Sequence, residues 1–142
     1  MLKVEHIGLA VKSFTDAIPL FEQLLSTPCY KTETVASEKV NTAFFQVGDT
    51  KIELLESTEP DGVIAKFIEK KGEGMHHIAF EVADIEAEMK RLQNLGFQLL
   101  NESPKKGADN KLVCFLHPKG TNGVLMELCQ ENEENREIRN KK

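Results

Sequence analysis

The sequence predicts an α+β fold made of two similar halves, each with one strand, one helix and three further strands. The first observation is an internal repeat: "HIGLAV", starting at His6, matches "HIAFEV", starting at His77. The second is a helical spacing of apolar residues after each copy, from Phe14 and from Ile85 onward. The third is that three short apolar and β-branched runs follow each helix, as is typical of strands. Two copies indicate an internal duplication within one pseudo-symmetric domain.

The turn residues that bound these runs give the expected limits of each element. We expect strands at 4–11, 29–36, 40–47 and 51–56, and again at 76–82, 98–103, 111–117 and 124–129. A short helix over about 61–71 links the two halves. The sequence then divides into a single domain at 1–130, with modules at about 1–57 and 75–130, and a polar tail at 131–142.

Local signals place the helix ends. Ser13 and Asp84 precede the two helices and have side chains suited to capping a helix N-terminus. Gly96 follows the second helix, as a C-terminal cap would. Pro19 lies inside the first helical pattern, where proline removes a backbone donor, so we expect a loosened first turn.

Composition excludes several classes of protein. The net charge is −5 over 142 residues with no basic stripe, which argues against a nucleic-acid or membrane-surface partner. No apolar run approaches the roughly 20 residues of a membrane span, and the first residues already read as a strand, so we expect no leader. The three cysteines, Cys29, Cys114 and Cys129, have no paired spacing. Reduced thiols in the cytoplasm fit this pattern.

Four residues stand out by their position on the strands. Neighbouring side chains on a strand point to opposite faces, so His6 shares a face with Gly8, away from the bulky residues that pack under a helix. His77 has the same position in the second half. On the last strand of each half, Glu53 and Glu127 oppose the apolar residues beside them. Each of these four strands therefore projects one potential ligand from the face that does not carry the helix-side core.

If the two sheets close around a common cleft, His6, Glu53, His77 and Glu127 meet in it. Two imidazoles and two carboxylates suit a divalent cation such as Co²⁺, Mn²⁺, Ni²⁺ or Zn²⁺ better than Ca²⁺ or Mg²⁺. The simpler alternative is that each histidine is satisfied in the core and each glutamate is solvated. The recurrence of all four at equivalent positions of the repeat favours the metal.

The remaining histidines receive other interpretations. His76 has the opposite parity from His77, so we expect it to pack or to support the site rather than to bind the metal directly. His117 ends a strand before a turn, where a capping or loop-anchoring role is favoured over substrate contact. No serine or cysteine has the context of an activated nucleophile, and "KKGEG" lacks the features of a phosphate loop.

Several motifs resemble one known family. "EHIGLAV", "FQVGDTKIELLE", "IAKFIEKKGEGMHHIAFEV" and "FLHPKGTNGVLMEL" resemble the methylmalonyl-CoA epimerases of the vicinal oxygen chelate superfamily, from about Val4 to Cys129. The superfamily also includes glyoxalase I, extradiol dioxygenases and antibiotic-resistance proteins. The resemblance implies tandem βαβββ modules with sheets curled around a metal-binding cleft. It also implies a divalent metal such as cobalt, an acyl-CoA substrate in propionate metabolism and, in many members, a homodimer. Its metal ligands would be His6, Glu53, His77 and Glu127.

The implied reaction is inversion at C2 of methylmalonyl-CoA, through an enolate formed by metal-assisted proton removal. Glu127 is the first candidate for a catalytic acid/base and Glu53 the second, with Glu38 or a water behind them. The chain departs from the family at Thr42, where some members have a glutamate proposed as a base. Glu38 and Lys39 also replace a common Gln-Gly pair, so the second base stays open.

Other functions are compatible with parts of this pattern. A glyoxalase I-type isomerase would use the same four ligands on a glutathione hemithioacetal. A dioxygenase is less favoured, because redox iron prefers two histidines and one carboxylate with open positions. A metal-free protein that binds a small ligand on the same fold would not need four ligand-type residues. Lysines of the segment 104–111 and Lys119 could attract coenzyme A phosphates, although solubilising loop charge is the simpler interpretation.

Overall fold

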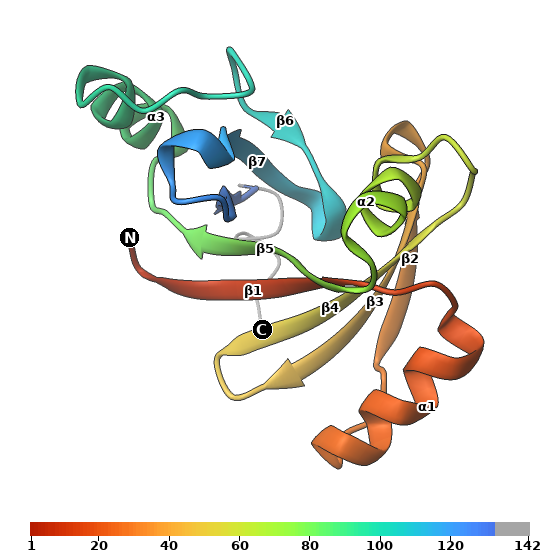
Figure 1. The fold of residues 1–142 in the computed structure, drawn as a ribbon. Coiled ribbons are helices and arrows are strands. Elements are labelled where there is room, and N and C mark those ends of the chain that lie inside the picture. The colour runs from red at the N-terminus through yellow and green to blue at the C-terminus, as the bar shows by residue number, and fades with distance from the viewer. Residues whose placement is uncertain (133–142) are drawn as a thin grey trace. The chain divides into compact units, whose positions relative to one another are not determined.

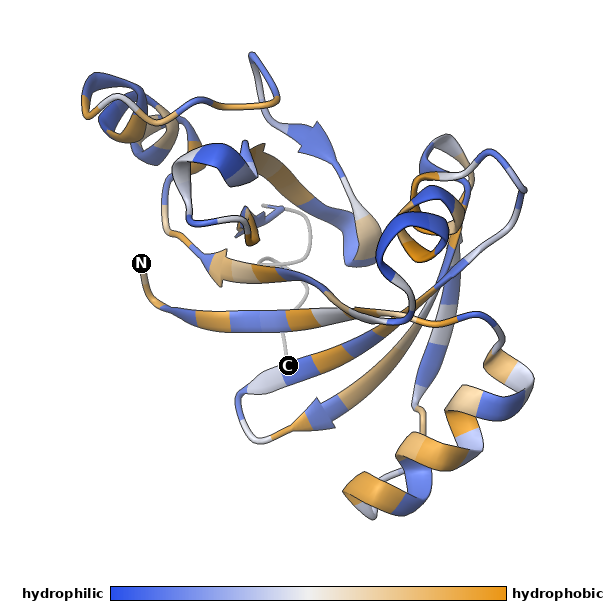
Figure 2. Ribbon diagram, viewed as in Figure 1, coloured by the Kyte–Doolittle hydropathy of each residue, from blue (hydrophilic) through white to orange (hydrophobic). Residues whose placement is uncertain are grey.

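The computed structural model describes residues 1–132, and these fall into two compact units that we treat separately (Figure 1). The N-terminal unit is His6–His77, and the C-terminal unit combines Met1–Glu5 with the chain from Ile78 onward. Each unit contains helices and strands, so the α+β class is confirmed. Figure 2 shows hydrophobic residues separated by hydrophilic ones along β1 (Lys3–Ala10), as expected of a strand whose side chains point to opposite faces in turn.

In the N-terminal unit, one helix follows the first strand and another follows the last. After β1 come α1 (Phe14–Leu25), β2 (Lys31–Val35), the 3₁₀ turn η1 (Ala36–Glu38), β3 (Val40–Val47), β4 (Thr50–Ser57) and α2 (Val63–Lys71). The strands lie in the order β2-β3-β4-β1, with β1 parallel to β4 and the other pairs antiparallel. The predicted linking helix is confirmed as α2.

The C-terminal unit repeats this arrangement. It contains the second half of β5 (Gly74–Glu81), then α3 (Ile85–Asn94), β6 (Lys105–Lys106), η2 (Ala108–Asn110), β7 (Lys111–Leu116), η3 (Pro118–Gly120) and β8 (Leu125–Glu131). These strands lie in the order β5-β8-β7-β6, and β7 is antiparallel to both of its neighbours β6 and β8. One strand, one helix and three strands thus follow one another in both halves, although β6 begins later than the strand predicted at 98–103.

Each sheet buries a different set of side chains on each face. In the N-terminal unit, Leu54 and Val11 pack under α1, whereas Leu55 and Ala10 pack under α2. Adjacent residues of β4 thus enter separate cores, as alternation requires. In the C-terminal unit, Leu128 packs under α3, and its neighbour Cys129 belongs to a separate cluster on the other face.

The helix starts show a second repeated feature that the sequence did not reveal. Ser13 and Asp84 cap α1 and α3 as predicted, each accepting a hydrogen bond from a backbone N–H of the first turn. In addition, the backbone N–H of Phe14 donates to Oε2 of Glu56 at 2.7 Å. The backbone N–H of Ile85 donates to Oε1 of Gln130, also at 2.7 Å. A side chain from the last strand of each unit therefore satisfies the first orphan donor of the helix.

Two local expectations are wrong. Pro19 lies inside a continuous α1, and the first turn is formed, because the backbone N–H of Ala17 donates to the carbonyl of Ser13 at 3.0 Å. Pro19 is exposed, which leaves the carbonyl that lost its donor accessible to water.

The strand expected at 98–103 is also not formed. Leu99 makes only an isolated bridge to Leu116, and the backbone N–H of Phe115 donates to the side chain of Asn101 instead of to a backbone carbonyl. Pro104 then follows with no N–H, so the regular strand β6 begins only at Lys105. The strand predicted at 124–129 extends as β8 into the expected tail, of which residues 133–142 lie outside the described part of the chain.

Two further findings concern the length of the helices and the state of the cysteines. None of the described helices is long and apolar enough to cross a membrane. All three cysteines are free thiols, Cys29 half-buried and Cys114 and Cys129 buried.

Candidate metal centre

Two buried imidazoles face each other in the N-terminal unit. Nε2 of His6, on β1, lies 2.9 Å from Nε2 of His77, on β5, and the ring planes are at 89°. The two residues are 6% and 5% exposed. Two nitrogens that each carry a lone pair repel at this distance unless a proton or a cation lies between them. A hydrogen bond with one shared proton satisfies this contact, and without that proton both nitrogens face one point, as two ligands of a cation would.

Gly8 provides the space for this arrangement. A β-carbon at position 8 would lie 2.6 Å from Nδ1 of His77, far inside van der Waals contact. Gly8 also pairs with Glu53 across the parallel β1–β4 ladder, so the glycine, the imidazole and the carboxylate are neighbours on one sheet face. The small residue that the parity argument placed beside His6 is thus the one over which His77 lies.

Each imidazole has a second partner on its other nitrogen. Nδ1 of His6 lies 3.1 Å from Oε2 of Glu53, which is 3% exposed. Nδ1 of His77 lies 2.9 Å from Nδ1 of His76. A proton on Nδ1, donated to such a partner, leaves Nε2 with its lone pair, which is how outer partners fix the tautomer of a metal-binding histidine. Both Nε2 atoms can then act as ligands.

The surroundings also keep the rings of His77 and His76 neutral. Burial, with smaller contributions from His6 and His76, lowers the pKa of His77 well below its ordinary value. Burial, and then the charge of Lys71, lowers the pKa of His76 to about 4. The ring of His76 packs edge-on against Phe67 of α2, with centroids 4.9 Å apart. This fits the supporting role expected for His76 from its parity.

The donor set suits the metal that the family resemblance implies. Two imidazoles and a carboxylate are within reach of one another in a buried setting, and this combination of N and O ligands favours borderline divalent cations over Ca²⁺ or Mg²⁺. Glu53 contacts His6 on the ring nitrogen that faces away from His77. A change of side-chain rotamer would be needed for Glu53 to bind the same cation directly.

Glu127 belongs to the C-terminal unit. It is 4% exposed, lies on β8 and pairs with Phe115 of β7. Glu53 pairs in the same way with Phe44 of β3, so the two carboxylates are equivalent in their own sheets. Thr42, at the position where some epimerases have a glutamate, is 1% exposed and lies on β3 opposite Leu55.

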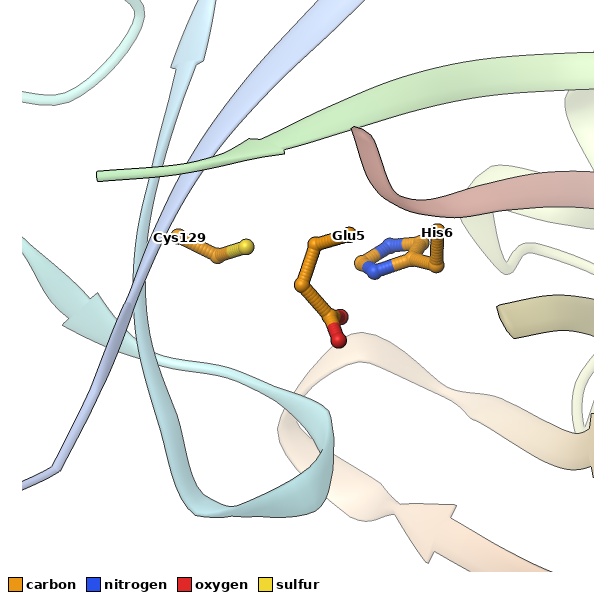
Figure 3. Close-up of side chains that lie close together, drawn as sticks. All are labelled: Glu5, His6 and Cys129. Carbon is orange, nitrogen blue, oxygen red and sulfur yellow. The ribbon is translucent and has the colours of Figure 1, made fainter. Parts of the chain in front are cut away.

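His117 and Glu5 both belong to the C-terminal unit. His117 caps η3, because its Nδ1 accepts a hydrogen bond from the backbone N–H of Lys119 at 3.0 Å, as expected. Sequence reasoning missed Glu5, which is 3% exposed although carboxylates are rarely buried. Its carboxylate lies within 4.8 Å of the Sγ of Cys129 (Figure 3). The only signal was that Glu5 stands in the repeat where His76 stands.

The Glu5–Cys129 pair has the chemistry of a packed thiol. Burial, followed by the charges of Glu127 and Glu5, raises the pKa of Cys129 strongly. A thiol with a raised pKa keeps its proton, and it is the thiolate that binds metals. The Sγ atom also contacts the carbonyl of Phe80 at 3.5 Å. We therefore assign Cys129 to the core of the C-terminal unit.

Comparison with known proteins agrees with the fold. The profile of the Glyoxalase/Bleomycin resistance protein/Dioxygenase superfamily matches residues 5–115, and the chain belongs to this superfamily. Within it, the chain is 36% identical over 129 residues to the human mitochondrial methylmalonyl-CoA epimerase, covering 90% of this chain and 73% of that protein.

Two further relatives cover nearly the whole chain. The uncharacterised Bacillus subtilis protein YqjC is 42% identical over 130 residues, covering 92% of this chain and 93% of that protein. The structure of a Streptomyces coelicolor methylmalonyl-CoA epimerase in complex with 2-nitronate-propionyl-CoA is similar with a TM-score of 0.89 at 30% identity, covering 92% of this chain and 95% of that one. The fold class predicted from the repeat, and the family that it resembled, are thereby confirmed.

Proposed function

We propose that this protein is an epimerase that interconverts the (R) and (S) forms of methylmalonyl-CoA at C2. The observation that carries the proposal is the pair of buried imidazoles of His6 and His77, whose Nε2 atoms face each other. The similarity to epimerases that act on this substrate supports the same reaction here. Membership of the superfamily does not fix the substrate or the reaction, so both are part of the proposal.

His6, His77 and Glu53 would hold a divalent cation, with Glu127 as the fourth ligand. The inclusion of Glu127 rests on the internal repeat, in which it is the counterpart of Glu53, and on the family resemblance. A bound cation supplies positive charge opposite the thioester oxygen, where negative charge develops as the α-proton leaves. Cobalt, manganese, nickel and zinc all fit this set of ligands.

The chain itself must move the proton. Inversion requires removal of a proton from one face of C2 and delivery to the other, which two positioned acid/base groups perform most simply. Glu127 is the first candidate and Glu53 the second, and both are buried carboxylates. Thr42 has no acid/base group of suitable strength, so Glu38 or a water is the remaining candidate for the second acid/base group.

The decisive experiment is exchange in D₂O. Purified protein is incubated with Co²⁺ and (S)-methylmalonyl-CoA in D₂O, and we expect α-deuterium together with the (R) epimer. A matched reaction with chelator gives the metal-independent background. Metal binding without exchange would contradict the epimerase. Conversion of the hemithioacetal of glutathione and methylglyoxal would instead support the glyoxalase I-type alternative.

A further inference from the structure

Glu73 ties the chain between α2 and β5 to the residues that follow β1. Its Oε2 accepts a hydrogen bond from the backbone N–H of Lys12 at 2.8 Å, and both residues belong to the N-terminal unit. Figure 1 shows the chain from α2 passing beside the end of β1 before it enters β5. The bond therefore joins the end of the strand that carries His6 to the start of the strand that carries His77.

Lys12 is a fixed point of attachment. The backbone N–H of Val11 donates to the carbonyl of Leu55 on β4 at 2.9 Å, and the backbone N–H of Phe14 donates to the side chain of Glu56, also on β4. The backbone on both sides of Lys12 is thus bound to the sheet. A hydrogen bond to Lys12 therefore fixes Glu73 relative to the same sheet.

The residues around Glu73 are loosely packed. Gly72 and Gly74 have φ angles of 80° and 152°, and a β-carbon at either position would meet no atom within 4 Å. These glycines serve the path of the backbone and not close packing. Glu73, Gly74 and Met75 are exposed, and the first two line, together with residues of α1, a cavity of about 430 Å³. Where few buried contacts hold a segment, one hydrogen bond has more influence on its position.

The position of this segment reaches the candidate ligands within a few residues. The chain runs from Glu73 through Gly74 into β5, where the ring of His76 lies against Phe67 and its Nδ1 lies 2.9 Å from Nδ1 of His77. A binding constellation requires its groups to be held within about 0.5 Å. A shift of the backbone at the start of β5 would therefore disturb the imidazole of His77.

We propose that Glu73 is a positioning residue of the candidate metal centre, because its carboxylate fixes the start of β5 and so keeps His77 opposite His6. The inference rests on the proposed function, since it concerns the same site. Glu73 acts through the backbone of β5 and is not a ligand. The alternative is that its negative charge alone attracts the cation. Glutamine distinguishes the two, because its amide oxygen still accepts a hydrogen bond but carries no charge.

Titration with Co²⁺, followed by its visible absorption, measures the effect on the metal centre. We expect Glu73→Ala to weaken Co²⁺ binding about fivefold, less than the loss of a group that contacts a ligand directly, and to shift the absorption of the bound ion. Glu73→Gln should recover most of the affinity. Glu69→Ala, which removes an exposed carboxylate of α2, is the matched control and should bind Co²⁺ like the wild type.

Hydrogen–deuterium exchange of the metal-free protein tests the positioning without a cation. We expect the amides of residues 74–77 to exchange about threefold faster or more in Glu73→Ala, the scale of one lost hydrogen bond, with the rest of the chain unchanged. Unchanged exchange there, or unchanged Co²⁺ affinity, would overturn the proposal. Equal losses of affinity in Glu73→Ala and Glu73→Gln would also overturn it, in favour of charge alone. Failure of the Co²⁺-loaded wild type to exchange methylmalonyl-CoA in D₂O would contradict the proposed function and not these results.

Discussion

Gly8 and His77 are complementary: the imidazole of His77 occupies the volume that a side chain at position 8 would fill. Any β-carbon there must displace the ring, because the atoms nearest to it all belong to the imidazole. The ring is the mobile end of a side chain, whereas the backbone of β1 is fixed by its ladder with β4. A substitution at Gly8 should therefore disturb the metal centre before it disturbs the fold.

We predict that Gly8→Ala weakens Co²⁺ binding by about tenfold or more, the scale of effect seen when the orientation of a ligand is lost. Titration with Co²⁺, followed by its visible absorption, measures this. Gly120→Ala is the matched control, because a β-carbon there would meet only Phe97, at 4.0 Å. Unchanged affinity in Gly8→Ala would show that His77 is not a ligand in the observed orientation.

Substitutions of the adjacent histidines His76 and His77 should differ in their effect on metal binding. His77→Ala removes a proposed ligand and should abolish measurable Co²⁺ binding. His76→Ala removes the partner of Nδ1 of His77 and should weaken binding by about tenfold while keeping the site. His76→Gln restores an acceptor for that N–H and should recover part of the loss. Equal losses in the two alanine variants, measured by calorimetry, would refute the distinction between ligand and support.

The repeat made much of this site predictable. Parity within "HIGLAV" and "HIAFEV" separated the histidine face from the helix face, because a period of two is a property of any strand. The period of two does not specify the rotamer of a side chain. The sequence therefore could not show that Glu53 contacts Nδ1 of His6 rather than its Nε2. It also could not anticipate that the side chain of Asn101 would replace a backbone partner and interrupt the expected strand.

The repeated helix contacts give a prediction about stability. Glu56→Ala and Gln130→Ala each leave a first-turn N–H without its side-chain acceptor. We expect each to lower the free energy of unfolding by about 1–2 kcal/mol, as for the loss of a helix cap. Urea denaturation followed by circular dichroism measures the change. Glu69→Ala, at an exposed position of α2, should change the free energy of unfolding little. A decrease in Glu69→Ala as large as in the other two variants would contradict a specific effect of the two helix contacts.

The three cysteines provide a test of the two cores. Cys29 is half-buried, whereas Cys114 and Cys129 are completely buried, and burial raises the pKa of both buried thiols. Because the thiolate is the reactive form, we expect iodoacetamide to modify Cys29 first at pH 8. Mass spectrometry of the native protein should find about one label per chain, and of the urea-denatured protein three. Rapid native labelling of Cys114 would contradict the packing of β7 under α3, since Cys114 belongs to that core.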